Sequence, residues 1–241
     1  MTVITKSELQ EYEKICKSDR PNLKLDIDIP WQEMYEEIVP LLDQFVVHRE
    51  NVGTGTWKSL TLHGYNMFAT QHKKTFNHEW TQLIDFCPTA YEFFLNWPCS
   101  NRKRIRYMLL EPGGMIDWHS DAEKNSLSGA INIALNNPKE CLFFQGRADE
   151  YIPWEAGDAR FINLVYPHKV VNFSDERRVH MIFHGAWKHD NPEWIKMVLR
   201  SWEKEKDKPA LKRTKLGMGN RHSNIDDAIK EFDGITVSER L

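Results

Sequence analysis

The sequence of 241 residues has few cysteines, little net charge and no long apolar run. Its four cysteines form no Cys-x-x-Cys pair, which argues against a zinc ribbon and against a disulfide framework. The formal net charge of −3 argues against a dedicated nucleic-acid or membrane-surface protein. No apolar stretch approaches a membrane span, and the first residues are too polar for a signal peptide. We therefore expect a cytoplasmic protein with neither a nucleic-acid partner nor a membrane partner.

Apolar periodicity divides the chain into three zones of one domain. Residues 1–100 are expected to be a mainly helical region that packs on the core, residues 101–190 a β-rich core, and residues 191–241 a C-terminal helix with a polar tail. Helices are predicted at 7–15, 31–39, 79–86, 89–97 and 192–206, and an early strand at 56–65. The basic stretch after Pro209 is expected to be a solvated extension.

The central zone alternates short strand-like segments with turn sequences rich in proline, glycine and asparagine. Strands are predicted at 104–110, 115–119, 128–135, 141–144, 151–154, 160–164, 168–173 and 178–185. A succession of short strands without intervening helices indicates a sandwich, a barrel or a jelly roll rather than βαβ units.

Two of these strands separate an apolar face from a face that leaves room for a ligand. The apolar positions, which we expect to pack against the core, are Ile131, Ile133, Leu135, Val179, Met181 and Phe183. The opposite faces carry Asn132 and Arg178, and we expect both side chains to point into one cavity.

Four residues of the central zone have an order and spacing that suit a non-haem iron site. His119 and Asp121 lie two positions apart and share one face of an extended strand, and His168 and Arg178 follow. Two histidines and a carboxylate can occupy one face of octahedral iron(II), leaving positions for a co-substrate and dioxygen. A nearby arginine can hold a dicarboxylate by a bidentate pair. Each residue alone has an ordinary explanation as a solvated side chain, and the combination favours the metal site.

The sequence from residue 106 to 121, RYMLLEPGGMIDWHSD, resembles the start of the double-stranded β-helix in 2-oxoglutarate- and iron(II)-dependent dioxygenases. It is most similar to the aspartyl/asparaginyl β-hydroxylase-like branch. The resemblance continues through NPKEC at 137–141, WEAGDARFIN at 154–163, and His168 and Arg178, with similar flanks near residues 57 and 191. It implies a mainly β fold with flanking helices and a double-stranded β-helix core (jelly roll, cupin-like).

The same resemblance implies that His119, Asp121 and His168 bind iron(II) and that Arg178 binds the C5 carboxylate of 2-oxoglutarate. Some members of the branch use two histidines alone, whereas Asp121 completes the triad here. The arginine and histidine that those members carry in the third core strand are absent, and Asn132 is expected to contact the C1 end of the co-substrate instead. The implied activity is hydroxylation of an amino-acid side chain (protein, peptide or free) or of a small metabolite, with release of succinate and carbon dioxide.

Two other interpretations are open. A cupin-like metalloenzyme would use the same three ligands without 2-oxoglutarate, and succinate formation separates it from a dioxygenase. A non-enzymatic jelly-roll module would bind a ligand in a polar cavity without an open iron site. His180 and His184 are expected to be structural or, at most, to contact the residues that bind the ligands. Ligand-like spacing is missing at His48, His63, His72, His78, His189 and His222.

Overall fold

The computed structural model describes residues 2–49, 55–70, 78–121, 130–186 and 191–214, and the structural statements below concern these residues. The predictions for the tail beyond residue 214, for the first residues of the strand at 128–135 and for His72, His189 and His222 lie outside the described residues. Within the described part of the chain, no helix combines the length and the apolar character needed to cross a membrane.

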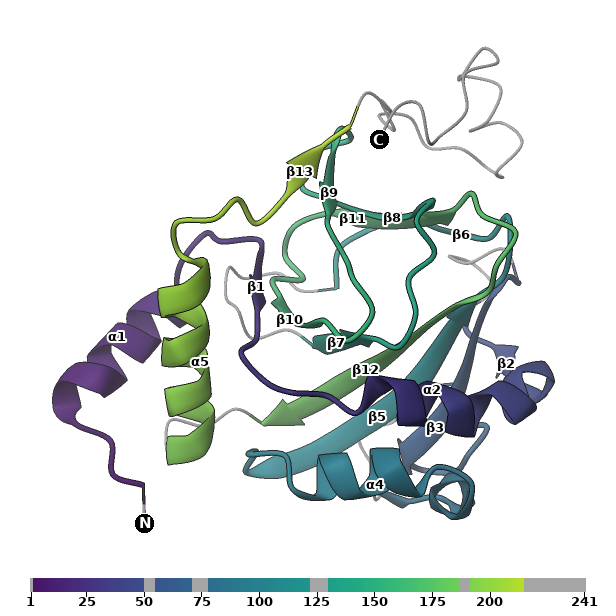
Figure 1. Cartoon of the computed structure of the whole chain (residues 1–241), viewed down its shortest axis with the longest axis horizontal. Coiled ribbons are helices and arrows are strands. Elements are labelled where there is room, and N and C mark those ends of the chain that lie inside the picture. The colour runs from purple at the N-terminus through teal and green to yellow at the C-terminus, as the bar shows by residue number, and fades with distance from the viewer. Residues whose placement is uncertain (1, 50–54, 71–77, 122–129, 187–190, 215–241) are drawn as a thin grey trace.

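Two antiparallel sheets form the core, with the longer strands in the lower sheet of Figure 1. The larger sheet contains, in spatial order, β1 (Asn22–Lys24), β10 (Ala159–Ile162), β7 (Ile131–Ala134), β12 (Arg178–Ala186), β5 (Asn101–Leu110), β3 (Trp57–Gly64) and β2 (Val46–Val47), and β4 (Glu79–Trp80) pairs with β3. The smaller sheet contains β13 (Lys212–Arg213), β9 (Glu150–Ile152), β8 (Cys141–Gln145), β11 (His168–Asn172) and β6 (Met115–His119).

The order of these strands is that of a double-stranded β-helix. Strands β5, β12, β7 and β10 are neighbours in one sheet, and β6, β11, β8 and β9 are neighbours in the other. The chain therefore crosses repeatedly from one sheet to the other, as in a jelly roll. The predicted fold class is confirmed, and each predicted core strand is present with its ends displaced by a few residues.

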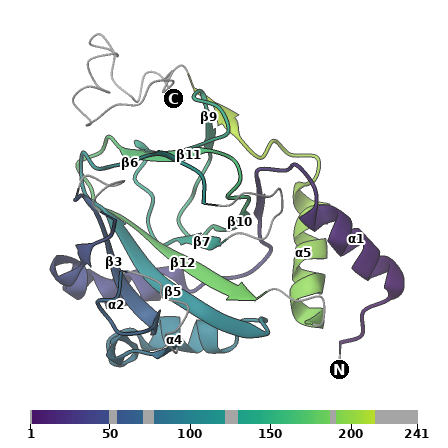
Figure 2. The same ribbon diagram turned by 180° about the vertical axis from the view of Figure 1, so that it is seen from behind.

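Helices cover the outer face and one edge of the larger sheet. They are α1 (Lys6–Cys16), α2 (Trp31–Ile38), α4 (Pro88–Leu95) and α5 (Pro192–Glu205), with 3-10 turns η1 (Val39–Gln44) and η2 (Gln82–Asp85). In both views α2 and α4 run along the larger sheet, whereas α1 and α5 lie side by side at the end where β1 is found (Figures 1 and 2). The smaller sheet is left as the opposite wall of the barrel.

The predicted division of strand faces is confirmed. The apolar positions Ile131, Ile133, Val179, Met181 and Phe183 are fully buried and belong to the main core, together with residues of all four helices. A second apolar cluster fills the space between the two sheets. Burial of the outer face fixes the register of these strands, because a shift by one residue would exchange the two faces. The residues between these core positions must then face the second sheet.

The helix predicted at 79–86 is wrong in its first half. β4 pairs there with β3, with His63 opposite Trp80. Thr81 then ends the extended segment, because its hydroxyl donates to the Thr61 carbonyl and accepts from the Leu83 amide. Only η2 is helical. Pairing with a long neighbouring strand outweighs the local helical pattern. The short strands β1, β2 and β13 were not predicted.

A tight turn joins β5 to β6 and leads the chain toward His119. Gly113 has a φ of 67°, a left-handed conformation that favours glycine. At Gly114 a Cβ atom would lie 2.7 Å from the Glu111 carbonyl oxygen, so this position also excludes larger residues. The Gly114 amide donates to that carbonyl at 2.9 Å. The turn predicted from the sequence therefore sets where β6 begins.

Candidate active site

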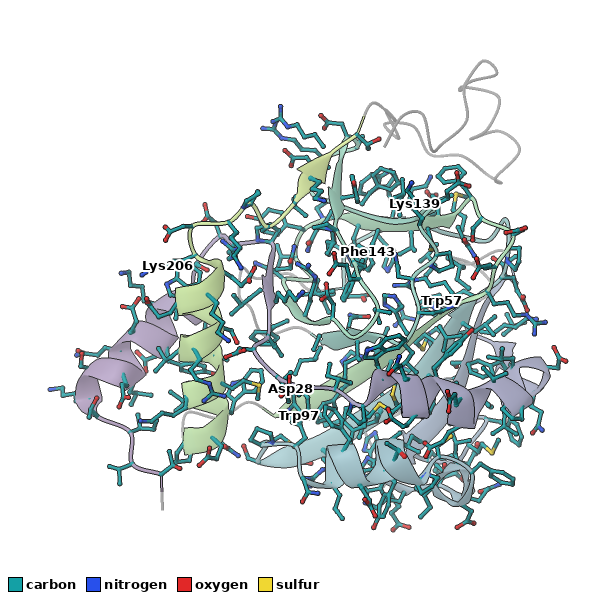
Figure 3. The ribbon with its side chains drawn as sticks, viewed as in Figure 1. Asp28, Trp57, Trp97, Lys139, Phe143 and Lys206 are labelled. Carbon is teal, nitrogen blue, oxygen red and sulfur yellow. The ribbon has the colours of Figure 1, made fainter. Side chains whose placement is uncertain are left out.

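All five residues predicted for the site line one cavity between the two sheets. His119 ends β6, Asp121 follows it and His168 begins β11, so these three come from the smaller sheet and its margin. Asn132 in β7 and Arg178 in β12 come from the larger sheet, as the face assignment predicted. Apolar side chains complete the walls, and two of them, Trp57 and Phe143, lie between the sheets in Figure 3.

His119, Asp121 and His168 bring one potential ligand atom each to within 4.8 Å of one another. Residues 119 and 168 are paired in the register of β6 and β11, and their ring centroids lie 4.2 Å apart. The Nε2 atom of His119 lies 4.0 Å from Oδ1 of Asp121. Such a cluster of two imidazoles and a carboxylate has the donor set of a facial iron(II) site.

Backbone carbonyls fix the orientation of both imidazoles. The Nδ1 atom of His119 lies 2.7 Å from the carbonyl oxygen of Asp117, and Nδ1 of His168 lies 3.1 Å from that of Tyr166. Because a carbonyl can only accept, each Nδ1 carries a proton, and the neutral form of each imidazole then has its lone pair on Nε2. Burial, with His119 nearby, lowers the pKa of His168 to about 4. His168 is therefore neutral near pH 7, the form that binds a metal.

Asp121 is the exposed member of the cluster. Its Oδ1 atom lies 3.4 Å from Nη1 of Arg49, and its backbone amide donates to the Leu164 carbonyl at 3.1 Å. The amide bond holds the chain beyond β6 against the segment that leads to β11. The carboxylate thus stays next to the two imidazoles although it belongs to no strand.

Arg178 is buried and is held by a chain of hydrogen bonds. Its Nη2 atom donates to Nδ1 of His180 at 2.7 Å, and Nε2 of His180 donates to Oδ1 of Asn137 at 3.2 Å. Burial, followed by the nearby Arg178, lowers the pKa of His180 well below its ordinary value, so the imidazole is neutral and can accept from the arginine. The Nε atom of Arg178 has no hydrogen-bond partner among the described residues. A buried guanidinium with an unused donor is suited to an anionic ligand.

Asn132 is buried at the position paired with Ile182 on β12. Its side chain lines the cavity with Arg178, in agreement with the predicted strand faces. Sequence reasoning missed Arg49, Arg104 and His48, although Arg104 and Arg106 alternate along β5 and thus share one face. That alternation was the available signal.

A family model described as aspartyl/asparaginyl beta-hydroxylase matches residues 28–188, about two thirds of the chain. The protein belongs to this family, and it is a 2-oxoglutarate- and iron(II)-dependent dioxygenase of the hydroxylase type. The family assignment favours this class over the two other interpretations. A search of curated proteins found no match.

Several solved structures are similar in fold at low sequence identity. An oxidoreductase of the 2OG-Fe(II) oxygenase family from Burkholderia pseudomallei has 12% identity and a TM-score of 0.45, over 76% of this chain and 95% of that one. A Trichoplax adhaerens prolyl hydroxylase, solved with a fragment of hypoxia inducible factor, has 10% identity and a TM-score of 0.45, over 78% and 96%. A Pseudomonas putida prolyl-4-hydroxylase has 11% identity and a TM-score of 0.43, over 76% and 98%. The family assignment rests on the matched family model.

Proposed function

We propose that His119, Asp121 and His168 bind iron(II) and that Arg178 binds the C5 carboxylate of 2-oxoglutarate. The convergence of three ligand atoms within 4.8 Å is the observation that carries the proposal. The two Nδ1–carbonyl contacts support it, because they leave Nε2 of both imidazoles available for a metal. The unused Nε donor of buried Arg178 supports the co-substrate site.

Bound iron(II), with 2-oxoglutarate and dioxygen, supplies the oxidising power for hydroxylation with release of succinate and carbon dioxide. The residues of the chain bind the metal and the co-substrate, orient them and exclude water from the cavity. Arg178 offers a planar fork to one carboxylate, and neutral His180 holds that fork in place. Asn132 lines the same cavity and would contact the C1 end of the co-substrate. Trp57 and Phe143 give the cavity apolar walls that limit access of water.

The substrate of this reaction is an amino-acid side chain in a protein, a peptide or a free amino acid, or a small metabolite. The family description, which names aspartyl and asparaginyl residues, supports the first of these. The experiment is an anaerobic titration of the protein with iron(II) and then 2-oxoglutarate, followed through the visible metal-to-ligand charge-transfer band. A saturable band is expected. Its absence despite iron binding would exclude 2-oxoglutarate as the co-substrate, and failure to bind iron would exclude the metal site.

Turnover gives the second half of the test. Succinate release from 2-oxoglutarate is measured in air with candidate substrates, and a substrate is accepted when it raises the rate and gains one oxygen atom by mass spectrometry. The matched control is the Asp121→Ala variant. This variant is expected to lose succinate release, because it removes a proposed ligand whose side chain is 36% exposed and not part of the core.

A further inference from the structure

A row of basic side chains lies on β5, next to residues of β12 that line the cavity. Arg106 in β5 is paired with Ile182 in β12, and Arg104 is paired with His184. Ile182 and His184 both line the cavity. Because paired strands lie about 5 Å apart, the two arginines of β5 occupy the next column of the same sheet face. Neither Arg104 nor Arg106 belongs to the proposed metal site or to the proposed 2-oxoglutarate site.

Arg49 extends this row toward solvent. It follows β2, its side chain is 47% exposed, and it reaches Asp121 at 3.4 Å. Within the described part of the chain, Asp121 is the one carboxylate at ion-pair distance from Arg49, Arg104 or Arg106. Under the proposed function that carboxylate is a metal ligand. The three guanidinium groups therefore carry positive charge that the described residues leave unbalanced.

Arg106 is the buried end of the row, with 5% of its surface exposed. Its Nη1 atom donates to Nδ1 of His48 and to the Thr70 carbonyl, both at 3.2 Å. The pKa of His48 is lowered to about 3, mainly by burial and then by the positive charges of Arg106 and Arg49. His48 is therefore a neutral acceptor that orients the guanidinium of Arg106. The Nε atom of Arg106 has no hydrogen-bond partner among the described residues.

A purely structural arginine would be expected to use its donors fully, since a buried charge without partners is costly. The pKa of Arg106 is lowered to about 9, first by burial and second by the positive charges of Arg104 and Arg49. The lowered pKa reflects the same cost of burying a charge without partners. An incoming anion would relieve both the unused donor and the mutual repulsion of the three guanidinium groups. A neutral acceptor could use the free donor but would leave the repulsion between the guanidinium groups, and a cationic group would relieve neither.

We propose that Arg49, Arg104 and Arg106 form an anion-binding subsite that holds a carboxylate or phosphate group of the substrate beside the metal site. That the bound anion is part of the substrate rests on the proposed function. Arg178 binds the co-substrate, and the β5 arginines bind the molecule to be hydroxylated. The substrate is thereby an acidic or phosphorylated compound or side chain.

The test measures binding of small anions by calorimetry. The 241-residue chain is saturated with 2-oxoglutarate and with manganese(II), which replaces iron and prevents turnover. It is then titrated with benzoate, phenyl phosphate or the neutral analogue benzamide. We expect one of the two anions to bind and benzamide not to bind. Preference for benzoate identifies a carboxylate substrate, and preference for phenyl phosphate identifies a phosphorylated one.

Three variants locate the binding. Arg104→Gln and Arg106→Gln are each expected to weaken anion binding at least tenfold. Lys103→Gln removes the same charge from an exposed side chain of β5 and is expected to have no effect. Because Arg104 is only partly buried, its variant provides the answer if Arg106→Gln does not fold. Absence of anion binding by the wild type, or equal affinity in all three variants, would overturn the proposal.

Two measurements separate this inference from the proposed function: binding of manganese(II) and 2-oxoglutarate to the wild-type protein, and the anion titration repeated without these two ligands. If the wild-type protein binds neither manganese(II) nor 2-oxoglutarate, the proposed function fails. Loss of anion binding specifically in the Arg104 and Arg106 variants would then still demonstrate the subsite. If the protein binds both ligands but these variants bind anions normally, the subsite fails and the proposed function stands.

Discussion

Replacement of Arg178 by lysine should weaken binding of 2-oxoglutarate without affecting the metal. Arg178 uses one Nη2 donor on His180 and has an unused Nε donor, so a fork remains for a carboxylate. Lysine keeps the charge but offers a single nitrogen, which must serve both His180 and the ligand. Loss of one charge-assisted hydrogen bond costs about 1.5–3 kcal/mol, and each 1.4 kcal/mol is about tenfold in affinity. We expect the dissociation constant of 2-oxoglutarate to rise about 10- to 100-fold.

The assay is the anaerobic charge-transfer titration with iron(II) present in excess. Arg177→Lys is the matched control, because Arg177 makes partly exposed ion pairs with Asp43 and Glu111. This control should bind 2-oxoglutarate like the wild type. Both variants should bind manganese(II) normally, which shows that the fold around the metal site is intact. An unchanged 2-oxoglutarate affinity in Arg178→Lys would remove Arg178 from its proposed role.

Three further predictions concern positioning, pH and helix capping. His180→Phe should raise the dissociation constant of 2-oxoglutarate while His180→Gln, which keeps an acceptor for Arg178, should restore part of the affinity; equal effects of the two would reduce His180 to packing. His48 and His180 have folded pKa values below 6.5, so their contribution to stability is present above pH 6.5 and is lost as the pH falls below it. Between pH 7.5 and 5.5 we expect the free energy of unfolding, measured in urea, to fall, with His48 contributing on the order of 1 kcal/mol of the loss. The loss should be smaller by that amount in His48→Gln, and an identical pH dependence would contradict the assignment. The Thr5 hydroxyl caps α1 by accepting from the Glu8 amide, and Thr5→Ala removes this cap. The substitution should lower the free energy of unfolding by about 1 kcal/mol. Ser7→Ala, at an exposed position of the same helix, should leave it nearly unchanged.

Much of the fold was predictable from local patterns. Alternation in strands such as residues 178–185 separates Met181 and Phe183 from Arg178 because one face meets the helices and the other the second sheet. The turn at Gly113 is equally local, since its left-handed backbone favours glycine. These features depend on neighbours within a few residues. The first half of the predicted helix at 79–86 was wrong because β4 pairs with β3, whose residues lie far from it in the sequence.

The site was predictable in its composition but not in its surroundings. His119, Asp121 and His168 were selected by residue type, spacing and resemblance, and the register of β6 and β11 then brings the two imidazoles together. The arginines of β5 were overlooked, although they alternate in the sequence. Whether they form a cluster depends on the positions of Arg49 and His48, which come from a different part of the chain. Such a cluster becomes visible only when the strands are arranged in space.

The most direct test of the metal site is a manganese(II) titration followed by electron paramagnetic resonance. The wild-type protein is compared with His168→Ala, Asp121→Ala and, as a matched control, His184→Ala, which alters another histidine of the same cavity. We predict one ion per chain for the wild type and for His184→Ala, and at least tenfold weaker binding for the other two variants. Wild-type affinity in His168→Ala and Asp121→Ala would contradict the claim that these side chains hold a common ion.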